Sequence, residues 1–389
     1  QTNLQTAPIV LVASGPSLDD SLTWLREHQN ELQIVTAGSS IGVLIRNGIM
    51  PSCAVFLERS SLIYDNDLME LIDEGFDLSS IPLISSMTLD PRVPRIFKNV
   101  AWFHRPLSTA LSLYPDEAYS KLLQSGPQSA NAALESMLHL GFKKILLIGC
   151  DFSAENRDKP RASQAIGSTP RDLNLPVSGR HGKTVFSSPS LYASSQYFSN
   201  AICVYGADVV SIAAGVKLDG IQLRIEGLSA ELAAEFKNNS PILSVFNSCK
   251  KSVVAPSDYK SRILQSKTSL IALFAELNDA VRQSDQWTLS LARYFDSKLQ
   301  LDESGLTPPS ALVKRLCHYP ISASLQPLHD ALPQDWSSCK EMVQLNLSWL
   351  EKVYICYFDF LQCVVNNAAK EDFQFSWFDV KQLALSLDQ

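Results

Sequence analysis

Residues 9–20 read Ile-Val-Leu-Val-Ala-Ser-Gly-Pro-Ser-Leu-Asp-Asp, so that an apolar run meets a glycine turn. The run predicts a buried β-strand, and the turn leads into the start of a helix. Gly15 lets the backbone approach a ligand closely, and Ser17 with the first helical amides can donate hydrogen bonds to an anion. The stretch carries neither a Walker loop nor the full dinucleotide-binding fingerprint. Two interpretations are open: a phosphate-binding turn, or a structural turn capped by Ser17.

Short β-rich runs alternate with helix-like segments up to about residue 221. This alternation is typical of a Rossmann-like α/β fold, with a mostly parallel sheet and helices on both faces. Ligands of such sheets bind beyond the carboxyl ends of the strands, so the residues that follow each strand are candidates for a site. The expected strands are 8–13, 33–37, 52–57, 81–85, 100–103, 144–148 and 209–212.

The strand rhythm stops at about Leu228, and long helix-like segments follow. In 260–301 apolar residues recur at spacings of three and four, which predicts one buried helical face, and 341–367 also has a helical pattern. A chain of 389 residues is long enough for two domains. We therefore expect an α/β domain over 1–226 and a helical domain over 227–389.

The composition of the chain argues against nucleic-acid binding, a bound metal and a membrane span. The formal net charge of −7 and a pI near 5.5 argue against a nucleic-acid-binding protein. The eight cysteines are scattered, no cluster has metal-ligand spacing, and no apolar run approaches the roughly 20 residues of a membrane span. We expect a cytoplasmic protein without a bound metal. Because the chain begins without methionine and soon reaches a core strand, we also expect that an upstream region was removed.

The segment from Asp151 to Phe186 is polar and has little periodicity. A connection of this length inside an α/β domain is usually a functional lid or a mobile loop. Its positive excess suits an anionic ligand, although a solvated loop with no specific role remains the alternative. The basic residues of the segment are Arg157, Lys159, Arg161, Arg171, Arg180, His181 and Lys183.

Four motifs follow one another in a recognisable order. They are Gly-Pro-Ser-Leu at 15–18, Cys-Ala-Val-Phe-Leu-Glu at 53–58, Ser-Gly at 125–126 and Leu-Gly-Phe-Lys-Lys-Ile-Leu-Leu-Ile-Gly-Cys-Asp-Phe at 140–152. In this order and spacing they resemble the motility-associated-factor (Maf) flagellin glycosyltransferases and the related 6-hydroxymethylpterin diphosphokinase MptE-like proteins. The series is also similar to that of bacterial CMP-sialic-acid-dependent sialyltransferases. The resemblance covers about residues 8–221.

This resemblance implies a transferase that moves a nonulosonic acid from its CMP derivative to Ser or Thr hydroxyls of flagellin, and so supports motility. The CMP-activated sugar is the donor substrate, and no separate cofactor is implied. The resemblance assigns His181 as the general base, and a base with a pKa near neutrality suits an acceptor hydroxyl. The implied nucleotide and phosphate contacts are Ser14, Gly15, Pro16, Ser17, Gly38, Ser39, Glu58, Ser125, Gly126, Asp151 and Arg180.

The sequence departs from these patterns in two places. The sialyltransferases place tyrosines near the leaving phosphate, but none occurs here between Phe152 and Tyr192, so arginine or lysine would have to substitute. Glu58 stands where asparagine or aspartate is more usual.

Two other functions remain open. The first is an ATP-dependent diphosphokinase-like enzyme, with Glu58 and Asp151 as candidate Mg²⁺ ligands. The second is a non-catalytic accessory protein that binds flagellin through the helical part.

Overall fold

The computed structural model describes most of the chain and divides it into two compact units. The first unit comprises Gln1–Pro106 and Ser120–Lys250, and the second holds the helices that follow Lys251. The described residues are 7–57, 60–105, 122, 124–166, 172–224, 226–238, 242, 244, 256–286, 288–299, 313, 316, 317, 320, 321 and 336–367.

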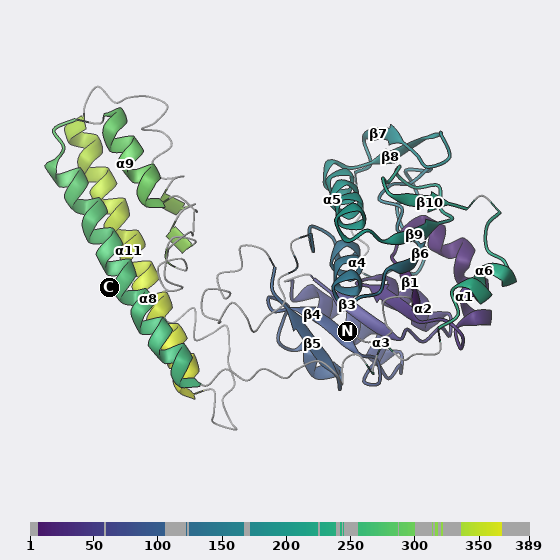
Figure 1. The fold of residues 1–389 in the computed structure, drawn as a ribbon. Helices are drawn as coiled ribbons and strands as arrows, with labels where there is room; N and C mark the ends of the chain where they lie inside the picture. Colours follow the sequence, from purple (N-terminus) through teal and green to yellow (C-terminus); the bar gives the residue numbers. More distant parts are fainter. Residues whose placement is uncertain are drawn as a thin grey trace. The chain divides into compact units, whose positions relative to one another are not determined.

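An eight-stranded parallel sheet forms the centre of the first unit (Figure 1). Its order is β10-β9-β6-β1-β2-β3-β4-β5, so the chain runs outward from β1 to β5 and then returns to the other side of β1. The strands are β1 (Pro8–Val12), β2 (Ile34–Ala37), β3 (Cys53–Phe56), β4 (Leu83–Ser86), β5 (Val100–Phe103), β6 (Lys144–Ile148), β9 (Asp208–Ser211) and β10 (Ile221–Leu223).

Both faces of this sheet are covered by helices. Along β1, Ile9 and Leu11 belong to one hydrophobic cluster, whereas Val10 and Val12 belong to another. Side chains alternate between the faces of a strand, so each cluster marks one face. The expected Rossmann-like fold is thus confirmed. Helices α4 (Ser129–His139) and α5 (Pro189–Tyr205) contribute to the first cluster, and α1 (Leu22–His28), α2 (Ser40–Arg46) and α6 (Ala230–Glu235) to the second.

All seven expected strands are present, but the polar segment after β6 holds two more. Strands β7 (Leu175–Ser178) and β8 (Thr184–Ser187) form a separate antiparallel pair, with Val177 opposite Val185. β7 is only partly buried, and both strands lack the apolar run by which we identified the seven expected strands. Strand β10, of three residues, was likewise not expected. The turn between them carries Arg180 and His181.

The boundary between the two units lies later than we expected. Residues 227–250 belong to the first unit, whereas the sequence suggested a boundary at 226. Leu232 and Phe236 pack into the cluster on one face of the sheet, and the Asn238 side chain donates a hydrogen bond to the Pro8 carbonyl at 2.8 Å. The alternation of strands and helices in the sequence stops before the first unit is complete. Helix α6 follows the last strand and is still needed to cover this face of the sheet.

The second unit consists of helices packed around Phe274, Phe295 and Phe358. The expected helix over 260–301 is two helices, which is a correction. The first of them ends near Ser284, whose carbonyl accepts hydrogen bonds from Trp336 Nε1 at 3.1 Å and Lys340 Nζ at 2.9 Å. Such bonds satisfy carbonyls left open at a helix end. The three long helices are α8 (Pro256–Gln283), α9 (Leu289–Leu299) and α11 (Trp336–Asn367). None of the described helices has both the length and the apolar character that crossing a membrane requires.

Candidate functional site

The strand order reverses between β1 and β6: β2 to β5 lie on one side of β1, and β6, β9 and β10 lie on the other. Strands β1 and β6 each end in a turn with glycine, and the Gly15 amide donates to the Gly149 carbonyl at 2.8 Å. In open parallel sheets, ligands bind at the carboxyl ends of the strands where the strand order reverses. The turns that follow β1 and β6 therefore form the floor of the candidate site.

The side chain of Asp151 spans these two turns. Its Oδ2 accepts the Ser17 amide hydrogen at 2.8 Å, and its Oδ1 accepts the Ser17 hydroxyl at 2.7 Å. Pro16, at the first position of the helical turn Pro16–Ser21, has no amide hydrogen. An internal carboxylate thus occupies the position that we expected a ligand phosphate to take. A phosphate contact by the Ser17 amide or hydroxyl, as the sequence suggested, would require the phosphate to displace this carboxylate.

Asp151 is 3% exposed. Burial raises the pKa of its carboxyl group, while the two hydrogen bonds from Ser17 and the charge of Arg180 act in the opposite direction. Its surroundings are tight, because a Cβ on Gly215 would lie 2.3 Å from the Asp151 carbonyl oxygen. The next residue, Phe152, is not a glycine yet has a φ of 54°, a strained conformation that is common at functional sites.

Arg180 is bound entirely within the protein. Its Nη2 donates to the Cys150 carbonyl at 2.6 Å, its Nη1 to the Ser211 hydroxyl at 2.6 Å and its Nε to the Val216 carbonyl at 2.9 Å. Burial lowers the pKa of the guanidinium, and Asp151 raises it. We therefore correct its expected role: Arg180 is a buried counter-charge for Asp151 and is not placed to bind a ligand.

A cavity of about 240 Å³ opens beside the ends of β1, β2 and β3, and we call it the first cavity. The Ser39 hydroxyl donates to the Ser14 hydroxyl at 2.9 Å, and Arg161 Nη2 donates to Ser14 at 3.2 Å and also to Ser39. Gly38 and the start of α4, including Ser129, also line the first cavity. The first amides of a helix carry partial positive charge and favour an anion.

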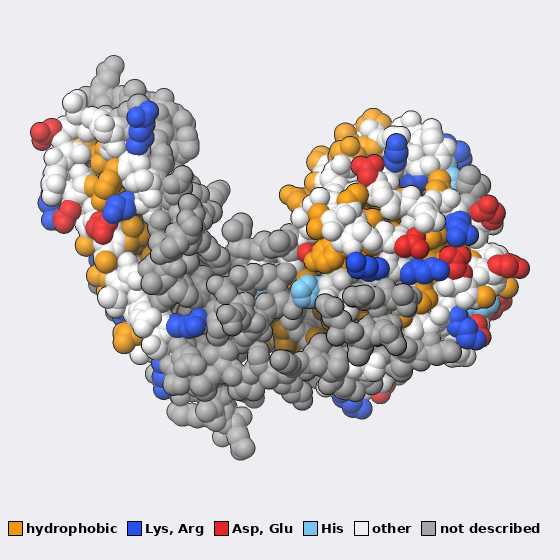
Figure 2. All heavy atoms as spheres, in the orientation of Figure 1, with side chains coloured by type: hydrophobic (Ala, Val, Ile, Leu, Met, Phe, Trp, Pro, Cys, Tyr) orange, Lys and Arg blue, Asp and Glu red, His pale blue; other side chains and the backbone are white. Residues whose placement is uncertain are grey.

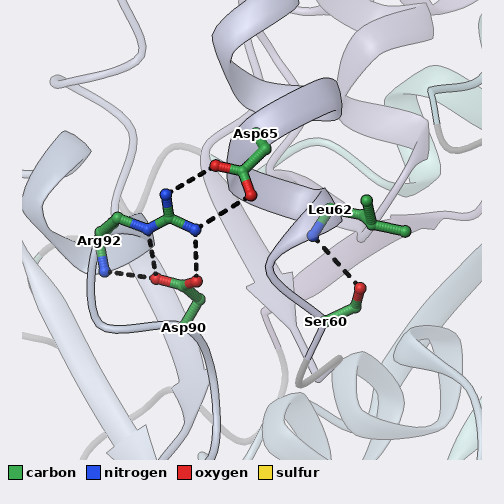
Figure 3. A network of polar contacts seen from close by, with 5 residues as sticks. All are labelled: Ser60, Leu62, Asp65, Asp90 and Arg92. Carbon is green, nitrogen blue, oxygen red and sulfur yellow. Dashed lines mark hydrogen bonds and ion pairs between the residues drawn. The ribbon is translucent and has the colours of Figure 1, made fainter. Parts of the chain in front are cut away.

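One wall of the first cavity comes from a turn of π-helix, Ile63–Leu68. Arg92 fixes this turn by donating to Asp65 at 2.6 Å and to Asp90 at 2.8 Å (Figure 3). The same guanidinium lies 4.4 Å from the centre of the Tyr64 ring. Its hydrogen bond lowers the pKa of Asp90. The wall that carries Asp67 into the cavity is thus held by a charged network.

A second cavity, of about 730 Å³, shares Asp151, Ser153 and Arg161 with the first. His181 lines this second cavity and is exposed. The sequence placed His181 in one site with Ser14 and Ser39, whereas the structure puts the histidine and the two serines in adjoining cavities. Asp19, Asp20, Glu155 and Lys159 also border the second cavity.

Residues 154–166, which we call the strap, border both cavities. The Ala162 amide donates to the Ser14 carbonyl at 3.0 Å, and the Ser163 hydroxyl donates to Asp19 at 2.6 Å. The Arg157 guanidinium lies 4.0 Å from the centre of the Phe186 ring. These contacts hold the strap against the turn that follows β1 and against Phe186 of β8.

The remaining expected residues lie elsewhere. Ser125 is buried, and its hydroxyl donates to the Leu122 carbonyl at 3.0 Å. Neither Ser125 nor Gly126 lines the first or the second cavity. Glu58 lies outside the described residues. Sequence reasoning missed Arg161 as a site residue, since nothing distinguished it from the other basic residues of its segment.

Comparison with known proteins agrees with the fold. Residues 1–157 match the family described as 6-hydroxymethylpterin diphosphokinase MptE-like. Among solved structures, the chain is similar to the Maf glycosyltransferase from Magnetospirillum magneticum AMB-1, with 20% sequence identity and a TM-score of 0.68. The similarity covers 100% of this chain and 59% of that chain. No curated protein matches. The resemblance to MptE-like proteins is thus confirmed over the amino-terminal part, and the Maf-type fold over the whole chain.

Proposed function

We propose that this chain is a metal-independent glycosyltransferase that moves a nonulosonic, sialic-acid-like sugar from a CMP donor to Ser or Thr of flagellin in the cytoplasm. The observation that carries the proposal is the first cavity, which lies at the reversal point of the sheet and combines Ser14, Ser39 and Arg161. The fold shared with a solved Maf glycosyltransferase supports the reaction class.

The charges of the first cavity suit a single phosphate group. Among its described lining residues, Arg161 is the one cation, and Asp67 and Asp151 are carboxylates. A CMP-nonulosonate carries one negative charge on its phosphodiester and one on its sugar carboxylate, and one guanidinium and a helix start can balance the phosphodiester charge. A nucleoside triphosphate carries several negative charges and is usually bound together with Mg²⁺. The charge balance therefore favours a CMP-sugar over ATP.

The second cavity suits the acceptor. Transfer needs a base that takes the proton of the acceptor hydroxyl, and histidine serves this role near neutral pH. His181 lines the second cavity, which adjoins the first at Asp151, Ser153 and Arg161. In this proposal the nucleotide occupies the first cavity, the acceptor hydroxyl enters through the second, and the sugar lies where the two meet.

Replacing His181 by alanine should slow transfer by about 100-fold or more, the usual loss when a general base is removed. The measurement is mass spectrometry of flagellin incubated with a CMP-nonulosonate in EDTA. The matched control is Lys183→Ala, because Lys183 is an exposed residue of the same turn and lines neither cavity. Transfer that persists at the wild-type rate in His181→Ala, or that requires an added metal ion, contradicts the proposal.

A diphosphokinase-like activity is the second candidate, and the family match over residues 1–157 favours it. Of its two expected Mg²⁺ ligands, Glu58 lies outside the described residues, and both carboxylate oxygens of Asp151 accept hydrogen bonds from Ser17. Metal binding by Asp151 would therefore have to break these bonds. This candidate predicts Mg²⁺-dependent ATP binding and release of AMP.

A non-catalytic accessory role is favoured by one feature of the second unit. Met342, Leu345 and Trp349 of α11 are exposed at spacings of three and four residues, which place them on one side of the helix. Apolar side chains are visible on the surface of the helices of the second unit (Figure 2). An accessory protein would bind flagellin without turning over a nucleotide, so the transfer assay also separates this candidate from the first.

A further inference from the structure

We infer that Arg161 of the strap, together with the hydroxyl groups of Ser14 and Ser39, binds the phosphate of the nucleotide in the first cavity. The inference rests on the proposed function and deepens it, because it names the cation that faces the departing phosphate. Arg161 was not among the residues that the sequence motifs assigned to the site.

The groups that the sequence did assign to the phosphate are already occupied. The Ser17 amide and hydroxyl both donate to Asp151. All three donating nitrogens of Arg180 contact protein oxygens, at distances of 2.6 to 2.9 Å. A phosphate at either place would have to displace a hydrogen bond of a buried charged side chain, Asp151 or Arg180, which is costly. The phosphate is therefore expected on the other side of Asp151, in the first cavity.

Arg161 is placed to receive it there. Its Nη2 reaches the hydroxyls that follow β1 and β2, and it also donates to the Ile166 carbonyl at 3.0 Å. The contacts of Arg161 are only partly buried, whereas those of Arg180 are buried. A phosphate oxygen is a charged acceptor that forms a shorter, stronger bond with a guanidinium, so it can replace the partly buried contacts of Arg161. The serine hydroxyls can rotate to donate to the same phosphate.

The strap fixes the position of this guanidinium. The two residues that follow Arg161 are both anchored to the turn after β1, Ala162 through the Ser14 carbonyl and Ser163 through Asp19. The backbone at Arg161 is therefore tied to the same turn that carries Ser14. Preorganisation of this kind lowers the cost of ordering a long side chain on binding.

Calorimetric titrations of CMP and of cytidine in EDTA separate a phosphate contact from a general effect on the site. For Arg161→Gln we expect CMP binding to weaken by about 10- to 100-fold, the usual effect of losing a charge-assisted hydrogen bond, with cytidine binding unchanged. Arg161→Lys, which keeps the charge without the planar fork, should lie between Arg161→Gln and wild type. The matched control is Lys183→Gln, which removes a positive charge at an exposed residue outside both cavities and outside the strap.

Two results would overturn the inference. Equal weakening of CMP and cytidine in Arg161→Gln would mean that Arg161 only shapes the site, and unchanged CMP binding would mean that it does not face the phosphate. Failure of the proposed function gives a different pattern. If the wild type binds ATP with Mg²⁺ and does not bind CMP, the glycosyltransferase proposal fails. The role of Arg161 is then tested by comparing how Arg161→Gln changes the binding of ATP and of adenosine. If the wild type binds no nucleotide, both fail.

Discussion

Gly149→Ala will destabilise the first unit by about 3 kcal/mol or more. A Cβ at this position would lie 2.1 Å from the Ala13 carbonyl oxygen and 3.1 Å from the Leu18 Cβ. The backbone cannot relieve this clash cheaply, because Ala13 belongs to the strand end that pairs with Ile148. The φ of Gly149 is also +66°, a conformation that costs an alanine about 1 kcal/mol.

Gly48→Ala separates the two causes. Gly48 has a φ of +70°, nearly that of Gly149, but a Cβ there would meet nothing within 4 Å. It should cost only about 1 kcal/mol, the backbone contribution alone. Urea unfolding of the full chain, followed at the transition of the first unit, measures both variants. If Gly149→Ala costs no more than Gly48→Ala, the two turns are not packed as the structure shows.

Arg180→Met will destabilise the first unit by about 3–5 kcal/mol at neutral pH, the range found when one partner of a buried charge pair is removed. The variant leaves Asp151 without its counter-charge and removes the donors to Cys150, Ser211 and Val216. The control is Arg224→Met, because Arg224 pairs with Glu235 at 3.2 Å at a site where its side chain is 41% exposed. Such a surface pair contributes about 1 kcal/mol or less.

The cost of Arg180→Met should also depend on pH. Burial raises the pKa of Asp151 in the folded protein, so stability falls as the pH rises through that pKa and the buried carboxyl group ionises. Without Arg180 this pKa rises further. A protonated Asp151 needs no counter-charge, so the difference in unfolding free energy between wild type and Arg180→Met should shrink as the pH is lowered. A difference that is the same at every pH would assign the whole effect to the lost hydrogen bonds.

Much of the fold could be predicted from the sequence because its signals are local. The alternation of β-rich runs with helix-like segments predicted the parallel sheet, and the glycine turn after β1 marked a candidate site. β7 and β8 were not predicted because, unlike the equally short β2 to β5, they carry no apolar run. The boundary at 226 was too early because α6 follows the last strand yet completes the core over one face of the sheet.

The site was harder to predict because its decisive contacts join distant parts of the chain. Ser17 and Asp151 are 134 residues apart, and nothing in the sequence around Ser17 indicates that a carboxylate takes its amide. Arg161 and Ser39 are 122 residues apart. Ser14, Gly38 and Ser39 each follow a strand, and on that ground they were expected to lie together; all three line the first cavity. It did not separate arginines that face a cavity from an arginine, such as Arg180, that is buried beneath it.

A crystal structure of the full chain grown with CMP in EDTA tests the central claim most directly. The account predicts CMP in the first cavity, with its phosphate on Arg161, Ser14 and Ser39 and the contact between Ser17 and Asp151 unbroken. A phosphate bound to the Ser17 amide in place of Asp151, or a nucleotide bound only in the second cavity, would contradict it.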